Sequence, residues 1–287
     1  MTSAANNNMP GGTSPEPRFD YDMWNHVDGI AAFLAGTANV IMQLSLPPVG
    51  YGVAESPVDS GKVTLHPLKR LRTTLSYLSV AMQGTEDERA RYREAVNQSH
   101  RQVRSRPGSP VKYNAFSPRL QLWVAACLYY GIVDMTERLH GPIDDADAEA
   151  LYKYCARLGT TLQMPIELWP PDRKAFDEYW RHTLATTSID DTVRDYLTEL
   201  VDLKALPLPV RLLGARPQRF VATGLLPPHL RDEMRLPWSE RDERILAMGL
   251  AAIGMVYRRL PHIVRRFPMN YYLWDTRRRM RKNLPLV

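Results

Sequence analysis

The chain has 287 residues, of which 44% are hydrophobic and 24% are charged. This composition is close to that of soluble globular proteins and argues against a largely disordered or fibrous chain. The net charge of +6 is unevenly placed, because residues 258–287 alone carry nine Lys or Arg against one Asp. The rest of the chain is nearly neutral, so a nucleic-acid-binding protein, which usually carries basic residues across its main fold, is not expected.

The N-terminal segment, residues 1–19, is rich in Asn, Pro, Gly and Ser, and we expect it to form a disordered leader. It has no secretory signal pattern. The two cysteines, Cys127 and Cys155, are too few for a disulfide framework or a cysteine-rich metal site. We therefore expect a cytoplasmic protein, with membrane association as a further option, in which both cysteines are reduced and buried.

Residues 29–54 contain no charged side chain, which raises the question of a membrane span. Scattered polar residues dilute this stretch, and the pair Pro47-Pro48 is expected to end any helix. The pattern therefore favours a buried helix that lines an apolar cavity over a transmembrane helix.

Apolar residues recur at three-to-four spacing through most of the remaining chain, which is typical of amphipathic helices. One helix is expected to begin at Thr85, which forms a capping-box pattern with Glu88. We see no alternating strand pattern, internal repeat or linker. The sequence predicts an all-α fold, a single helical domain over residues 20–270 followed by a basic C-terminal segment, residues 271–287. The expected helices are 20–46, as one or two, then 68–82, 85–103, 118–139, 144–158, 171–183, 188–204, 210–222 and 240–260, with 47–67 and 105–117 irregular.

No two of the seven histidines lie three or four residues apart, so no helix presents a pair of histidines to a metal. A metal would need a single axial histidine or ligands from distant segments. His100 follows Val96 by four residues and precedes Val103 by three, which places it on the buried face of its helix. Two interpretations stay open: a core histidine with one hydrogen bond, which spacing alone favours, or an axial ligand of iron.

Arg70, Thr74 and Tyr77 lie at positions i, i+4 and i+7 of the helix expected over 68–82, so they share one edge. A guanidinium, a hydroxyl and a phenol in a row suit a carboxylate or a polarised oxygen at the rim of an apolar pocket. The alternative is a solvated edge with Arg70 extended into water.

Two further residues carry candidate roles. Trp123 belongs to a wide aromatic and aliphatic face that suits either the protein core or a wall for a flat hydrophobic cofactor. Glu55 follows the uncharged stretch, and partial desolvation would raise its pKa and suit it to proton transfer. The alternative for Glu55 is an ordinary acid in a surface loop.

Short motifs in a characteristic order give the chain a resemblance to a known family. It resembles the MpaB-type oxygenases, which share a catalytic domain with the bacterial latex-clearing rubber oxygenases, over about residues 24–268. The motifs are, in order, QLSLPPVGYGVAES, RLRTT, QGTEDE, HRQV, YNAFSPRLQLWVAACL, LPLPVRLLGA, TGLLPPHLRDEMRLPW and YRRLPHIVRRFP.

The resemblance implies a globin-like helical core around heme b. His100 matches the proximal iron ligand of the family, and Arg70 and Thr74 match an Arg-x-x-x-Thr pair beside the heme. Glu55 falls near a carboxylate that the rubber oxygenases use as a base. The sequence departs from the pattern at Ala125, where many relatives are expected to carry histidine.

The resulting hypothesis is a heme b-dependent oxygenase that uses dioxygen on a hydrophobic small molecule, with an isoprenoid as the substrate class implied by the resemblance. His100 would bind the iron, and Arg70, Thr74, Tyr77 and Trp123 would surround the cofactor. The alternatives are a non-catalytic heme carrier or sensor, and a helical scaffold held at a membrane surface by the basic segment 271–287.

Overall fold

The computed structural model describes residues 28–59 and 62–287. The leader expected over residues 1–19 lies outside this part of the chain. The described residues form helices joined by loops and contain no strand, apart from an isolated β-bridge between Arg104 and Asn114. The prediction of an all-α fold in a single helical domain is confirmed.

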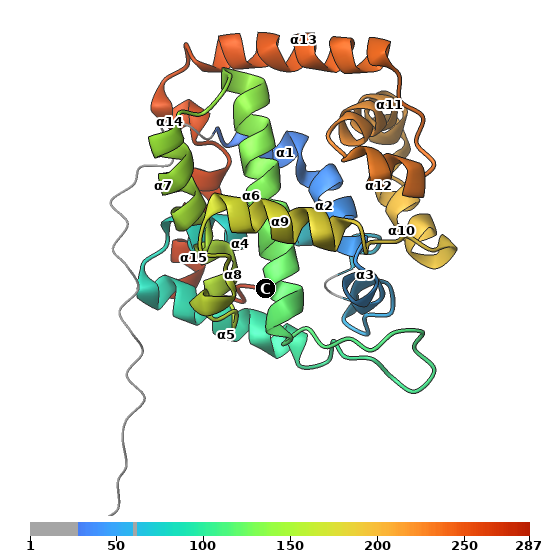
Figure 1. Cartoon of the computed structure of the whole chain (residues 1–287). Helices are drawn as coiled ribbons and strands as arrows, with labels where there is room; N and C mark the ends of the chain where they lie inside the picture. The colour runs from blue at the N-terminus through green and yellow to red at the C-terminus, as the bar shows by residue number, and fades with distance from the viewer. Residues whose placement is uncertain (1–27, 60–61) are drawn as a thin grey trace, which may run out of the picture.

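Most of the helices follow one another with short connections, and a long loop joins α5 to α6 (Figure 1). In chain order they are α1 (Ile30–Leu34), α2 (Gly36–Leu44), α3 (Pro47–Ala54), α4 (Pro67–Gln83), α5 (Glu86–His100), α6 (Pro118–His140), α7 (Asp145–Cys155), α8 (Arg157–Thr160), the 3-10 helix η3 (Ile166–Leu168), α9 (Arg173–Leu184), α10 (Asp191–Val201), α11 (Leu208–Gly224), α12 (Pro228–Glu233), α13 (Glu240–Tyr257), α14 (His262–Arg265) and α15 (Met269–Arg281).

Helix α6 runs through the middle of the molecule and contacts α1, α2, α7, α8, η3 and α13 (Figure 1). Its side chains are apolar on most sides, and such a helix must be surrounded by others to remove that surface from water. Trp123, Cys127 and Met135 are accordingly fully buried. The helix begins with Pro118 at its first position and ends at Gly141, whose φ of +91° favours glycine.

Helices α4, α5 and α15 pack together at one side of α6. The turn between α4 and α5 is fixed by the predicted capping box, in which Thr85 and Glu88 exchange two hydrogen bonds. The Tyr92 hydroxyl of α5 donates to the Thr73 carbonyl of α4 over 2.8 Å. Helix α15 packs along α4, so most of the segment expected to be a basic C-terminal end is a helix of the main body.

The segment expected to be irregular over 47–67 contains α3, and this expectation was wrong in part. Pro47 and Pro48 begin this helix instead of ending the preceding one, because proline fits the first helical turn where no amide hydrogen is needed. The helix expected over 144–158 is interrupted at Ala156, between α7 and α8. Helices α12, α14 and α15 were not expected.

The uncharged stretch 29–54 is divided among α1, α2 and α3. Within the described residues, no helix is long and apolar enough to cross a membrane. The buried side chains of this stretch, among them Ile41 and Met42, belong to the main hydrophobic core.

A first prediction concerns the crossing of α13 over α6. A Cβ atom added at Gly254 would lie 1.8 Å from the Leu139 carbonyl oxygen. We therefore expect Gly254→Ala to lower the free energy of unfolding by about 2 kcal/mol, because the helices must separate. The measurement is urea denaturation followed by circular dichroism.

The matched control lies on the same helix. A Cβ atom at Gly249 would meet nothing within 4 Å. Gly249→Ala should therefore raise the free energy of unfolding by about 0.5–1 kcal/mol through helix propensity. Equal effects of the two substitutions would contradict the close approach of α13 to α6.

Candidate functional site

The structure brings two of the predicted site residues together. Arg70 lies on an exposed part of α4, and His100 is the last residue of α5. The guanidinium of Arg70 is close enough to contribute to the lowered pKa of His100. Thr74 lies one helical turn beyond Arg70 and is also exposed. The edge predicted for Arg70 and Thr74 therefore faces outward near the end of α5.

The imidazole of His100 is partly buried and makes an edge-on contact with Phe116, with ring centroids 6.2 Å apart. Its Nδ1 atom is buried and has no hydrogen-bond partner in the described part of the protein. Burial, and secondly the charge of Arg70, lower the pKa of His100 to about 4. The ring is therefore neutral at neutral pH and keeps an unshared electron pair. The interpretation of His100 as a core histidine predicted one hydrogen bond to the ring, and Nδ1 makes none within the described residues.

This arrangement can be tested against the cofactor that the resemblance implies. Within the described residues no group of three or more His, Cys, Asp or Glu is placed to hold a metal ion. A heme iron takes only one or two axial ligands from the protein, and a neutral imidazole is a common one. The unpartnered ring nitrogen of His100 in a poorly hydrated place fits that requirement, and the cation of Arg70 nearby suits the acidic groups of a porphyrin.

Tyr77 does not stay on the predicted edge with Arg70 and Thr74. Its hydroxyl donates to the Leu158 carbonyl over 2.5 Å, and its ring packs against Tyr92 with centroids 6.3 Å apart. Burial raises the pKa of Tyr77. The phenol therefore ties α4 to α8 in the interior.

Trp123 lies in a packed aromatic core. Its ring is stacked on Trp180, with centroids 5.1 Å apart and an interplanar angle of 17°. The ring of Tyr130 also stacks on Trp180, with centroids 4.4 Å apart. The Trp123 Nε1 donates to the Gln43 carbonyl over 3.1 Å. Both the stacking and the hydrogen bond support the core interpretation of this aromatic face.

Glu55 is held by two hydroxyl groups that the sequence did not indicate. It follows α3 and is partly buried, and its Oε2 accepts hydrogen bonds from Tyr113 over 2.8 Å and from Ser109 over 2.7 Å. Burial and the neighbouring Glu55 raise the pKa of Tyr113. These donors come from the loop between α5 and α6, more than 50 residues away, so only the fold could reveal them. The arrangement fixes the carboxylate at one place beside the end of α3.

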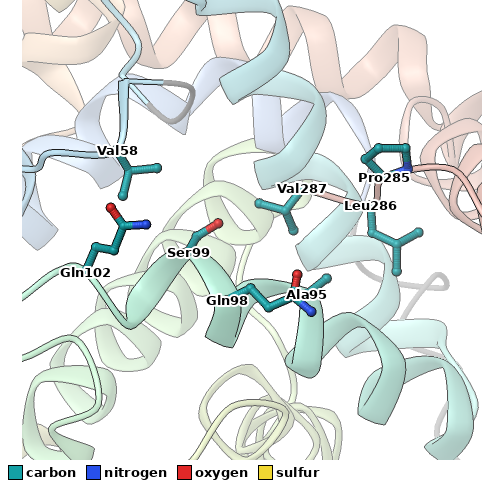
Figure 2. Close-up of a pocket in the computed structure, with 8 residues that line it drawn as sticks. All are labelled: Val58, Ala95, Gln98, Ser99, Gln102, Pro285, Leu286 and Val287. Carbon is teal, nitrogen blue, oxygen red and sulfur yellow. The ribbon is translucent and has the colours of Figure 1, made fainter.

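A pocket of about 280 Å³ opens between α5 and the last residues of the chain (Figure 2). The C-terminal residues are held there because Arg72 donates to the Leu286 carbonyl over 3.1 Å and Arg279 donates to the Pro285 carbonyl over 3.0 Å. Arg70, Thr74 and His100 are not among its lining residues, although Ser99 precedes His100 directly. The lining residues are Val58, Ala95, Gln98, Ser99, Gln102, Pro285, Leu286 and Val287.

Comparisons with known proteins agree with the motif order. The profile of the family described as "ER-bound oxygenase mpaB/B'/Rubber oxygenase, catalytic domain" matches residues 23–265. Uncharacterized proteins from Mycobacterium bovis and Mycobacterium tuberculosis are each 51% identical over 254 residues, which cover 88% of this chain and the whole of each relative. The solved structure of a latex clearing protein in the closed state matches 88% of this chain and 69% of its own, with 15% identity and a TM-score of 0.47.

The lowered pKa of His100 predicts how acid affects the stability of the protein without any added cofactor. The pKa is about 4 when folded and 6.5 when unfolded, so the unfolded chain binds the proton more readily. The stability is therefore fully present above pH 6.5 and is lost as the pH falls towards 4, by about 3 kcal/mol in total. Urea denaturation across this range should show the loss in the wild-type protein.

The control variants are His100→Gln and His182→Gln, the latter at an exposed position of α9. The first should flatten the pH dependence between 6.5 and 4, and the second should leave it unchanged. A pH dependence that persists in His100→Gln would show that the imidazole of His100 is hydrated in the folded protein.

Proposed function

The chain belongs to the family of mpaB-type and rubber oxygenase catalytic domains, and on that premise we propose that it is a heme b-dependent oxygenase acting with dioxygen on a hydrophobic small molecule. The family is one of heme-dependent oxygenases. The observation that carries the proposal for this chain is the buried, unpartnered Nδ1 of His100 beside Arg70. A histidine that serves packing alone does not need a ring nitrogen without a hydrogen bond, whereas an axial ligand must keep a ring nitrogen available.

His100 and Arg70 would share the binding of the cofactor. Bound heme would supply an iron centre at which dioxygen can be activated. His100 would hold the metal with its neutral ring, and its edge-on contact with Phe116 would limit rotation of that ring. Arg70 would pair with a propionate, and the Thr74 hydroxyl one turn away would donate a hydrogen bond on the same side.

Glu55 would act as the base towards the substrate. Two hydroxyl donors, from Tyr113 and Ser109, hold its carboxylate in one orientation, and general bases work from such fixed positions. We propose an allylic hydrogen of an isoprenoid chain as the proton it removes, since the family resemblance implies that substrate class. The apolar side chains of α2 and α6 would exclude water from the chain of the substrate.

The binding of heme can be tested by its absorbance. We expect purified protein, supplied with hemin, to show a Soret band and about one heme per chain. His100→Ala should lose this band because the axial ligand is gone, and His182→Ala should keep it because His182 lies exposed on α9. An unchanged band in His100→Ala would contradict the assignment of the ligand.

The role of Glu55 can be tested by oxygen uptake with farnesol or squalene. We expect Glu55→Gln to lower the turnover rate by about 100-fold, as loss of a general base does, while the Soret band stays unchanged. The control is Glu94→Gln at an exposed position of α5, with no change expected. Turnover at the wild-type rate in Glu55→Gln would remove the base role. Heme binding without any oxygen uptake in the wild-type protein would favour a carrier or sensor.

A further inference from the structure

Helix α13 presents an apolar face that no other element covers within the part of the chain that the structure describes. It lies along the outer edge of the molecule, across the end of α6 (Figure 1). Its inner side packs through Leu246, Leu250 and Gly254. On its outer side the exposed fractions are 66% for Met248 and 52% for Met255. Contiguous apolar side chains left in water in this way mark an interaction surface.

The outer residues form one continuous stripe along the helix. Their spacing alternates between four and three residues, which places Arg241, Ile245, Met248, Ala252 and Met255 on the same side of α13; Arg259 follows in the turn after the helix ends at Tyr257. Between Arg244 and Arg258 the helix carries no charged residue, and arginines stand at both ends of the stripe. The stripe consists of Arg241, Ile245, Met248, Ala252, Met255 and Arg259.

The charges at the two ends are available to a partner. Among the described residues, none of Arg241, Arg244, Arg258 and Arg259 makes an ion pair with a carboxylate, although Arg241 and Asp242 attract each other electrostatically. Arg244 donates to the Glu240 carbonyl, Arg258 to the His140 carbonyl and Arg259 to the Met255 carbonyl. The acidic residues of the first turn do not lie on the stripe. Asp242 closes the capping box with Ser239, and Glu243 accepts hydrogen bonds from Trp238 and Arg138. Glu240 lies to the side at the start of the helix.

The basic segment 271–287 differs in this respect. Arg277 pairs with Glu88 over 2.7 Å, and Arg278 and Arg279 both pair with Asp275. These pairs neutralise much of the charge that the composition suggested was free. A membrane contact of this protein is therefore better supported at α13 than at the C-terminal segment.

The charge pattern decides between two occupants of the stripe. If a second copy packed along it, Arg241 would face Arg259 in an antiparallel pair and Arg241 in a parallel pair, so the arginines of the stripe would meet in both. Only the acidic first turn of α13, which lies beside the stripe, would offset them in the antiparallel pair. A membrane with anionic phospholipids has no such conflict, because apolar side chains enter the boundary between headgroups and acyl chains while arginines reach the phosphates. Exposed apolar side chains continue after α13: Ile263 of α14 is 72% exposed, and Phe267, which follows α14, is 53% exposed.

We propose that the outer face of α13 is a peripheral membrane-binding surface for anionic phospholipids. The helix would lie flat at the membrane surface, with Met248 and Met255 inserted and the terminal arginines bound to lipid phosphates. This surface does not depend on heme binding, so its tests and those of the oxygenase function give separate results.

A fluorescent label at Met248 tests the insertion directly. Both native cysteines are fully buried, so an environment-sensitive dye attaches to the engineered thiol of Met248→Cys. We expect the emission to shift to the blue when the full chain meets vesicles of phosphatidylcholine with phosphatidylglycerol, and much less with phosphatidylcholine alone. The matched control is Ile166→Cys, exposed to 49% on η3, where we expect no shift.

Vesicle flotation of unlabelled variants tests the two parts of the stripe. Met248→Glu should abolish flotation while the Soret band and circular dichroism stay unchanged, and Ile166→Glu should float like the wild type. Replacing Arg241 and Arg259 by Gln should weaken binding to anionic vesicles by roughly fivefold for each arginine.

Three outcomes would overturn the proposal. The first is an absence of any vesicle-dependent shift at position 248. The second is flotation that survives Met248→Glu but is lost when Arg277 and Arg278 are replaced by Gln, which would place the contact at α15. The third is a dimer in light scattering that Met248→Glu converts to monomer without any effect on flotation, which would make the stripe an interface between copies.

Discussion

The neutral imidazole of His100 depends on how α5 ends against α4 and Phe116. Burial makes the protonated ring costly, and the cation of Arg70 raises that cost further. Because no described group bonds to Nδ1, the fold gains no hydrogen bond there, and the ring contributes through its contact with Phe116. A buried polar atom without a partner calls for an explanation, and the proposed bond to a heme iron would supply one for Nδ1.

The position of that imidazole is itself set by contacts distributed along the chain. The capping box of Thr85 and Glu88 fixes where α5 begins, and the hydrogen bond from Tyr92 to Thr73 fixes its angle on α4. Arg277 of α15 binds the same Glu88 that completes the capping box. The C-terminal helix therefore stabilises the start of α5 from outside, and the placement of His100 at its far end depends on a segment that looked like a charged tail in the sequence.

Local patterns in the sequence were sufficient for the long helices. The apolar spacing and the cap of α5 predicted α4, α5 and α6 nearly to their ends, because periodicity and capping are properties of neighbouring residues. They were insufficient for α3 and α15. Proline after an apolar helix fits both the end of one helix and the beginning of the next, and the narrow apolar side of α15, with Leu273 buried, becomes meaningful only when α4 lies against it.

The candidate site shows the same division. Motif order located His100, Arg70, Thr74 and Glu55, but helical spacing placed Tyr77 on an outward edge that it leaves to bond with Leu158. A spacing of seven residues defines a helix face only to within tens of degrees, and the bond to α8 decides which way the phenol turns. The partners of Glu55 were beyond any local rule, because the loop that carries Tyr113 meets α3 only through the tertiary fold.

The proposed heme site and the proposed membrane-binding surface lie at opposite ends of α6. His100 contacts Phe116, two residues before α6 begins, whereas α13 crosses the helix at Leu139, near its other end. A helix of 23 residues is about 33 Å long, so a chain docked through α13 would hold the candidate heme site well away from the lipid. A hydrophobic substrate would then not pass directly from the acyl chains under α13 into the site. The membrane-binding surface would determine where the protein works, and the apolar interior near α5 would determine what it binds. Because the two are built from different helices, a substitution would remove membrane binding or cofactor binding without removing the other.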